Sequence, residues 1–308
     1  MLTKHLLALF DLLDRPDASG AAVCAYLQDL GPAQVSWRRI TGDAGGTDAV
    51  RVLIPGLSGR TVGGQAPTLG VIGRLGGLGA RPGITGFVSD GEGALAALTA
   101  AAKLTEMSAR GDRLPGDVLV CTHVCPAAPV IPHEPVPFMG APVDMAAMNR
   151  AEVDPQMDAI LSIDTTRGNR LVNQNGVALT PTVRRGWILR VSEDLLTVLE
   201  RTSGLPALTL PLSIQDITPY GNGVYHMNSI LQPSTATAAP VVGVALTAGT
   251  AVPGCGTGAT GGRECELAAR FAVEVAKGFG AGKCAFYDPA EAALLERQYG
   301  SMTHLQEQ

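Results

Sequence analysis

Three polar side chains with metal-binding or acid–base capacity stand at the ends of apolar runs: Asp90, His123 and Asp164. Such runs are typical of buried strands, and residues at the carboxyl ends of parallel strands point into the crevice where these sheets bind ligands. Two carboxylates and an imidazole on adjacent strand ends suit a divalent metal that keeps one position open for water. His226, in a loop rich in polar side chains, is a fourth candidate ligand.

Each candidate ligand also has a structural interpretation. Ser89 and Glu92 flank Asp90 with the spacing of a capping box, and an acidic residue at a helix start suits the helix dipole. Asp164 precedes two threonines and a Gly-Asn pair, so its side chain also fits a turn that binds its own backbone. A lone histidine such as His226 is commonly a packing residue. The sequence leaves both interpretations open for each position.

A metal-bound water needs a general base, and two glutamates are candidates for it. Glu92 lies two residues after Asp90, and Glu134 lies in a proline-flanked segment beside His133. A metal lowers the pKa of its water towards neutrality, so we expect Glu92 or Glu134 to accept the proton. We expect His133 and Asn222 to contact the substrate.

Cys125 offers a different chemistry, because it lies two residues after His123. A histidine beside a cysteine can generate the thiolate that acts as a nucleophile. A buried structural cysteine is the commoner case for such a residue. Catalysis by Cys125 is therefore an alternative to the metal site.

A glycine-rich run occupies residues 253–262, directly before a helix that we expect to start near Arg263. The exposed N–H groups of such a helix start attract anions. We expect Cys255, Gly256 and Thr257 to hold a carboxylate of the substrate. The run lacks the Gly-Lys-Thr ending of a phosphate-binding loop, which disfavours a nucleotide.

The elements that would position these residues alternate between strands and helices. Helices are expected at residues 2–13, 21–30, 93–110, 193–202 and 264–277, and strands at residues 50–54, 117–122, 159–163, 187–191, 207–212 and 241–246. This alternation predicts an α/β fold, a three-layer αβα arrangement with a mainly parallel mixed sheet. Without an internal repeat, residues 1–308 are expected to form a single domain.

Composition narrows the class of protein. With 308 residues, 46% of them hydrophobic, the chain can bury a large core. The net charge is −5 and basic residues do not cluster, so nucleic acid is not an expected partner. An apolar run of about 18 residues, as a membrane helix requires, is missing, and so is a signal-peptide pattern. We expect a cytoplasmic protein whose six scattered cysteines are reduced.

Five segments closely resemble an uncharacterised bacterial domain-of-unknown-function family (DUF1177-like), and the likeness extends over nearly the whole chain. The segments are residues 123–126, 132–139, 164–166, 215–223 and 253–255. This resemblance is specific, but it implies no particular reaction.

More distantly, the order of elements is similar to that of the dinuclear zinc aminopeptidases of the glutamyl- and tetrahedral-aminopeptidase type. The likeness rests on Asp90 in a Ser-Asp-Gly turn, on Asp164 after a later strand, and on a Val-Gly-Val strand at residues 242–244. It implies an aminopeptidase-like fold, here without the inserted β-barrel domain, because too few residues separate Gly56 from Asp90. It also makes a homo-oligomer plausible.

The chain departs from those peptidases at three of their functional positions. Residues 55–58 replace a histidine after the first strand, residues 122–126 replace a Glu-Glu pair, and residues 250–253 replace a terminal histidine. A metal site, with zinc as the expected ion, would therefore need a set of ligands that differs from that of the peptidases. The sequence thus predicts a metal-dependent hydrolase of an amide or peptide-like bond in a small substrate. The alternative is a non-catalytic small-molecule-binding protein on a degenerate aminopeptidase fold.

Overall fold

The computed structural model describes residues 1–74, 77–81, 84–132, 134, 138–166, 172–226, 228–252 and 261–307. Its helices, with short 3-10 turns labelled η, are α1 (Leu2–Leu13), α2 (Gly20–Gln28), η1 (Arg60–Val62), η2 (Ser89–Gly91), α3 (Glu92–Ala109), α4 (Met145–Glu152), α5 (Glu193–Ser203), η3 (Ile214–Ile217), η4 (Gln232–Ala236), α6 (Gly262–Gly280), α7 (Pro289–Tyr299) and η5 (Thr303–Gln306). Its strands are β1 (Gln34–Gly42), β2 (Gly45–Ile54), β3 (Leu69–Gly73), β4 (Gly77–Arg81), β5 (Ile84–Thr85), β6 (Val118–Ala128), β7 (Val130–Ile131), β8 (Phe138–Met139), β9 (Ala159–Thr165), β10 (Gly176–Leu179), β11 (Val183–Arg184), β12 (Trp187–Ile188), β13 (Leu208–Thr209) and β14 (Val241–Thr247).

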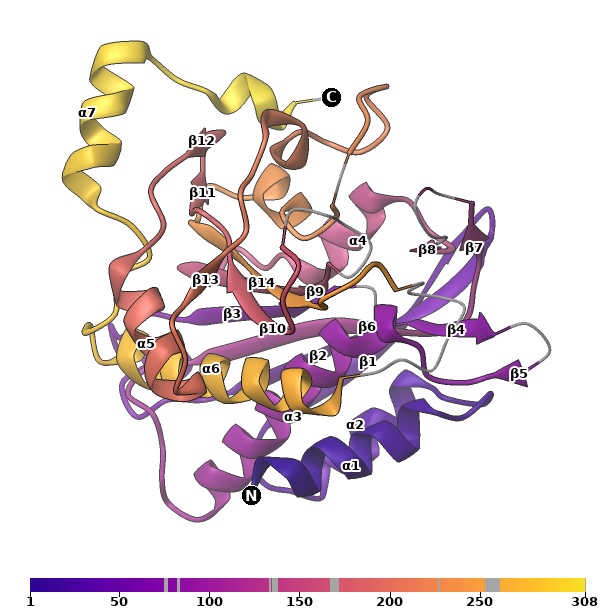
Figure 1. The fold of residues 1–308 in the computed structure, drawn as a ribbon. Coiled ribbons are helices and arrows are strands. Elements are labelled where there is room, and N and C mark those ends of the chain that lie inside the picture. Colours follow the sequence, from indigo (N-terminus) through magenta and orange to yellow (C-terminus); the bar gives the residue numbers. More distant parts are fainter. Residues whose placement is uncertain are drawn as a thin grey trace.

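The main sheet has the strand order β1-β2-β6-β3-β9-β14-β10-β13 (Figure 1). Its central neighbours β6, β3, β9 and β14 run parallel to one another. On one side β2 pairs antiparallel with both β6 and β1, and on the other β10 pairs antiparallel with β14. The predicted α/β fold with a mixed, largely parallel sheet is therefore confirmed.

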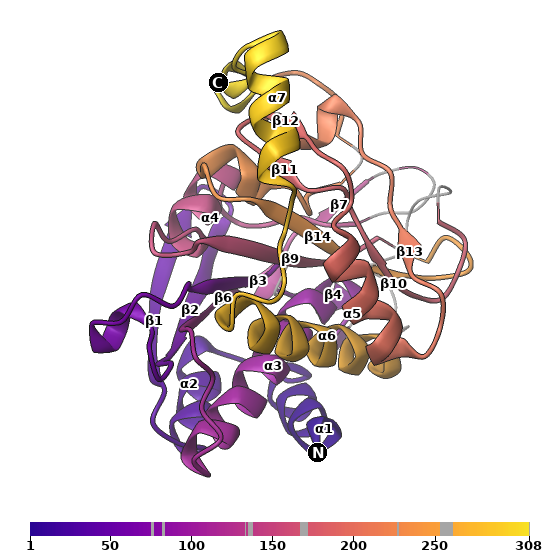
Figure 2. The ribbon, with the colours of Figure 1, turned by 90° about the vertical axis from the view of Figure 1, so that its left-hand side faces the viewer.

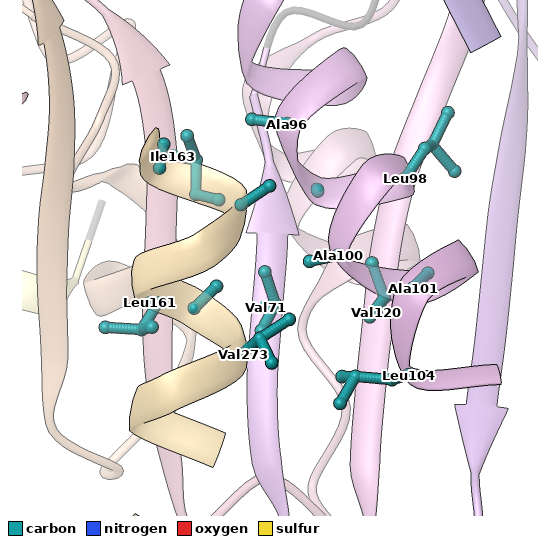
Figure 3. Close-up of a cluster of buried hydrophobic side chains, with 14 of the residues drawn as sticks. Val71, Ala96, Leu98, Ala100, Ala101, Leu104, Val120, Leu161, Ile163 and Val273 are labelled. Carbon is teal, nitrogen blue, oxygen red and sulfur yellow. The ribbon is translucent and has the colours of Figure 1, made fainter. Parts of the chain in front are cut away.

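The central strands are apolar at consecutive positions because both faces of the sheet are covered. Val71 and Leu161 belong to a core on one face of the sheet, where α3 and α6 pack (Figure 3). Their neighbours along the chain, Ile72 and Ile160, belong to a second core on the opposite face. Since successive side chains of a strand alternate between faces, both cores need apolar residues from the same strands.

The two faces of the sheet are covered differently. Helices α1, α2, α3, α5 and α6 lie on the first face, and α3 presents the small side chains Ala96, Ala100 and Ala101 within this packed layer (Figures 1 and 3). The second face carries α4, the turns η3 and η4, and loops. Residues 204–240 contain several prolines and glycines, which interrupt helices, so the expected helix layer on this face is only partly present.

Several elements were not predicted from the sequence patterns, among them β1, β3, β10, α4 and α7. Strand β1 is exposed at most positions and so lacks the alternation of apolar and polar residues that marks a strand. Two predicted strands are also shorter than expected. Residues 187–191 contain only Trp187–Ile188 as a strand, and residues 207–212 contain only Leu208–Thr209.

The order in which the chain adds strands to the sheet changes direction at β3. From β3 the chain proceeds through α3 to β6 on one side, and it later returns to β9 on the other. The carboxyl ends of β3 and β9 are adjacent, since Gly73 is in register with Ile163 and the backbone N–H of Arg74 donates to the Ile163 carbonyl at 2.8 Å. Open α/β sheets bind ligands beyond the strand ends at such a switch point. Within the described residues, no helix has the length and apolar character to cross a membrane.

Candidate functional site

Four buried titratable side chains gather at the switch point, and we call them the strand-end cluster: Arg74, His123, Glu152 and Asp164. Arg74 directly follows β3, Asp164 lies near the end of β9, and Glu152 is the last residue of α4. His123 is on β6, one residue beyond the partner of Gly73. The charge of Arg74 acts on all three of the others.

Arg74 is the centre of this cluster and was not predicted from the sequence. Its side chain is only 2% exposed and forms an ion pair with Glu152, which is 1% exposed. A second guanidinium nitrogen contacts the sulfur of Met145. Among the described residues, Arg74 Nε and Glu152 Oε1 have no hydrogen-bond partner. Unsatisfied buried polar atoms are costly, so this cluster is a place where function has to be considered.

The protonation states in the cluster follow from burial. Burial raises the pKa of Asp164 to about 6, while the Ser229 hydroxyl, which donates to Asp164 Oδ2 at 2.6 Å, opposes this shift. Burial also raises the pKa of Glu152, and its ion pair with Arg74 acts in the opposite direction. Burial and the charge of Arg74 lower the pKa of His123 to about 3, so its imidazole is neutral at pH 7.

Each predicted metal ligand is engaged by a group of the chain. Asp90 lies in η2, where Oδ2 accepts a hydrogen bond from the backbone N–H of Met139 at 2.8 Å. His123 Nδ1 is 2.8 Å from the Thr47 hydroxyl. Asp164 Oδ1 accepts from the backbone N–H of Thr165 at 2.7 Å, which agrees with the turn interpretation of this aspartate. Asp90 also lies in the first turn of η2, directly before α3, which agrees with its interpretation as part of a helix start, although the N-cap residue of α3 is Gly91 and not Ser89.

His226 lies on the loop after η3 and packs against Tyr220. The two rings stack with centroids 4.2 Å apart, and His226 Nε2 lies 3.1 Å from the Thr218 carbonyl oxygen. Nearby, Asn222 Oδ1 accepts from the backbone N–H of Val224 at 2.9 Å and closes a turn. The packing role weighed for His226 therefore accounts for its contacts.

The residues expected to react lie in different surroundings. Glu92 is fully buried, and its Oε1 accepts from the backbone N–H of Gly261 at 2.5 Å, which links the starts of α3 and α6. Glu134 is exposed. Cys125 is buried, and burial raises the pKa of its thiol, which works against the thiolate that nucleophilic catalysis requires. The predicted substrate contacts His133, Cys255, Gly256 and Thr257 lie outside the described residues.

The donor set does not fit a metal ion. Within the described ranges, no three His, Cys, Asp or Glu side chains are placed to hold one. Asp90, His123 and Asp164 are held by Met139, Thr47 and Ser229, and the charge of Arg74 acts on His123 and Asp164. A second positive charge at this point would be repelled.

A groove of about 990 Å³ lies between β1 and α4, and we call it the β1–α4 groove. Its walls come from residues 38–41 of β1, from α4, from η4 and from Tyr220. It lies next to the strand-end cluster, since Met145 lines the groove and contacts Arg74. Tyr220 also connects the groove to the cluster, because it lines the groove and is close enough to Asp164 to feel its charge. Burial and this negative charge both raise the pKa of the Tyr220 hydroxyl.

The charges that line the groove are all positive: Arg38, Arg39 and Arg150. No Asp or Glu occurs among the described lining residues. Arg39 donates to Asp48 at 2.8 Å, whereas Arg38 and Arg150 are exposed and form no ion pair with a described residue. The groove escaped sequence analysis because β1 and α4 were not predicted, although the adjacent pair Arg38-Arg39 was a visible signal.

A family model for "Protein of unknown function (DUF1177)" matches residues 38–308. The chain belongs to the DUF1177 family. The predicted resemblance to this family is thus confirmed, and no curated protein matches the chain. The likeness to zinc aminopeptidases stays a prediction.

The DUF1177 match includes both sites described above. It begins at Arg38 and extends past Gln306, which also lines the groove, so the strand-end cluster and the β1–α4 groove lie inside it. Helices α1 and α2 lie before its first residue. The match assigns no activity, so the function has to be argued from the geometry.

Proposed function

We propose that the protein binds an anionic ligand in the β1–α4 groove. The observation that carries this proposal is the lining of the groove, in which three arginines face a cavity without an acidic side chain among the described residues. Guanidinium groups bind carboxylates and phosphates through paired hydrogen bonds. This function corresponds to the small-molecule-binding alternative from the sequence.

Electrostatics favours an anion here despite the overall charge of the chain. The net charge is −5, so a groove lined by cations is a local exception that concentrates anions. Arg38 and Arg150 are available for a ligand because no described carboxylate pairs with them. Hydrogen bonds to charged groups contribute about 1.5–3 kcal/mol each, so two such contacts contribute about 3–6 kcal/mol and support binding in the millimolar to tens-of-micromolar range.

The test is a thermal shift and calorimetry experiment with citrate, succinate and inorganic phosphate, and with uncharged succinamide as the control ligand. At a ligand concentration about 100 times the Kd, stabilisation is about 2.7 kcal/mol, which raises Tm by on the order of 5 °C. Arg150→Gln and Arg38→Gln should each weaken binding at least tenfold. The matched control is Arg201→Gln, which removes an exposed arginine of α5 outside the groove. Binding of no anion, or equal loss in the control, would refute the proposal.

The hydrolase predicted from the sequence is a second candidate. It is favoured by Asp164, a carboxyl at the switch point whose pKa of about 6 allows proton exchange near neutral pH. The described residues do not supply three ligands for a metal, so a metal site at Asp164 requires further ligands from outside the described residues. Plasma mass spectrometry of tag-free protein, wild type and Asp164→Asn, tests this: stoichiometric zinc that is lost in the variant supports a metallohydrolase, and metal-free wild type refutes it.

A further inference from the structure

Strand β1 forms a free edge of the main sheet (Figure 2). It pairs with β2 along all nine residues, and no described strand pairs with its other side. Among the described residues, the one hydrogen bond to a backbone group on that side is long, from the Gln28 side-chain amide to the Val35 carbonyl oxygen at 3.5 Å. In an antiparallel pair, alternate residues direct their N–H and C=O groups away from the partner. β1 therefore presents a row of unpaired backbone groups.

This free edge lies along the β1–α4 groove. Four consecutive residues of β1, 38–41, line the groove. No residue of β2, the strand that pairs with β1, is among the described lining residues. The cavity therefore borders β1 on the side away from β2, where its backbone groups are unpaired. Its volume of about 990 Å³ is at the upper end of the roughly 300–1,000 Å³ usual for small-molecule sites, so it has room for an extended ligand.

The charges along this edge select the kind of partner. β1 carries Arg38 and Arg39 but no acidic residue, and Arg150 of α4 adds a third cation on the opposite wall. A second copy of the chain, paired edge to edge, would bring its own arginines towards these. Like charges opposite each other destabilise strand pairing, whereas opposite charges stabilise it.

We propose that the ligand of the groove is an extended acidic peptide segment that adds to the sheet as a strand beside β1. This inference rests on the proposed anion-binding function and narrows it to one ligand class. Backbone hydrogen bonds to β1 supply affinity that is independent of the peptide sequence. Glu or Asp side chains at alternate positions of the peptide reach Arg38 and Arg150 and supply the preference for acidic sequences.

The experiment compares five probes by calorimetry. They are citrate, the peptide acetyl-Glu-Thr-Glu-Thr-Glu-Thr-amide, two versions of this peptide that are N-methylated at alternate residues in one register or the other, and a version with Lys in place of Glu. We expect the acidic peptide to bind at least tenfold more tightly than citrate. One of the N-methylated peptides should bind at least tenfold more weakly than the acidic peptide, because it can no longer donate backbone hydrogen bonds to β1. The Lys peptide should not bind. Trp37, on β1 and 46% exposed, offers a fluorescence signal for the same titrations.

The outcomes separate this inference from the function on which it rests. Equal binding of the acidic peptide and both N-methylated peptides would overturn strand addition and leave anion binding intact. Failure of both citrate and the peptide to bind would overturn both. Arg38→Gln and Arg150→Gln should weaken binding of the acidic peptide, whereas the control Arg201→Gln should leave it unchanged. Light scattering could also show that the wild type is a dimer and that Arg38→Glu dimerises more tightly. That result would mean that β1 pairs with a second copy of the chain, and it would overturn the inference.

Discussion

Replacing Arg74 by Met tests whether the strand-end cluster is held together by its buried ion pair. Arg74 and Glu152 are 2% and 1% exposed, so neither charge is stabilised by water. Methionine keeps most of the side-chain volume but leaves Glu152 buried without its cation. Removing one partner of a buried ion pair costs about 3–5 kcal/mol. Burial raises the pKa of Glu152, so in the variant this carboxyl takes up a proton, and the cost at pH 6 should lie near 3 kcal/mol.

The sign of the pH dependence follows from the same shift. A carboxyl with a raised folded-state pKa contributes stability at low pH that is lost as the pH rises through that value. The destabilisation by Arg74→Met should therefore grow from pH 6 to pH 9. The double variant Arg74→Met/Glu152→Met removes both charges and should recover most of the loss, since apolar replacement of a whole buried pair is often neutral or stabilising.

Urea unfolding followed by circular dichroism, at pH 6, 7.5 and 9, measures these differences. Thermal unfolding should show the single variant melting roughly 6–10 °C below wild type, at about 2 °C per kcal/mol for a chain of this size. A matched control is Arg60→Met, which breaks a half-exposed ion pair with Asp158 and should cost at most about 1 kcal/mol. A loss below 1 kcal/mol for Arg74→Met, or a double variant as unstable as the single one, would refute the reasoning.

Three further predictions follow from the buried titratable groups. Asp164 has a raised pKa of about 6 against about 3.9 unfolded, so the stability of wild type relative to Asp164→Asn should fall by about 2 kcal/mol between pH 4 and pH 7. A stability difference that does not change with pH would contradict the raised pKa. His123 has a lowered pKa of about 3, so wild type should lose stability relative to His123→Gln as the pH falls from 6.5 towards 3, measured by urea unfolding. Cys125 should react with iodoacetamide only after unfolding, as peptide mass spectrometry can establish; rapid labelling of the native protein would restore the thiol hypothesis.

The fold could be predicted where burial imposes a regular pattern. The runs at 159–163 and 241–246 are apolar at nearly every position because parallel strands are covered on both sides, and they coincide with β9 and β14. β1 could not be found this way, since its side chains are mostly exposed and its position depends on pairing with β2. β3 was hidden because glycines occupy two of its five positions and carry no pattern.

The candidate site was predicted in part. The strand-end rule selected Asp164 and His123, and both lie at the switch point. It did not select Arg74, because no apolar run was predicted before it, nor Glu152, which reaches the cluster from α4. An ion pair between residues 78 positions apart has no signature in local sequence. Asp90 and His226 were selected by type and place, yet Asp90 accepts a hydrogen bond from a backbone N–H, and His226 stacks on a neighbouring ring and contacts Thr218.

The strand-end cluster and the β1–α4 groove are best understood together. A buried ion pair is weak evidence for stability, since apolar residues of similar size commonly do as well. Its place beside a cation-lined groove therefore points to a role in holding α4 in position, because Glu152 ends that helix and Met145 begins it. Both residues contact Arg74, so the arginine connects both ends of α4 to the end of β3. Asn149 and Arg150 lie between these two contacts and line the groove. Arg74→Met should on this argument weaken anion binding without touching the ligand, whereas the Arg60→Met control should leave it unchanged.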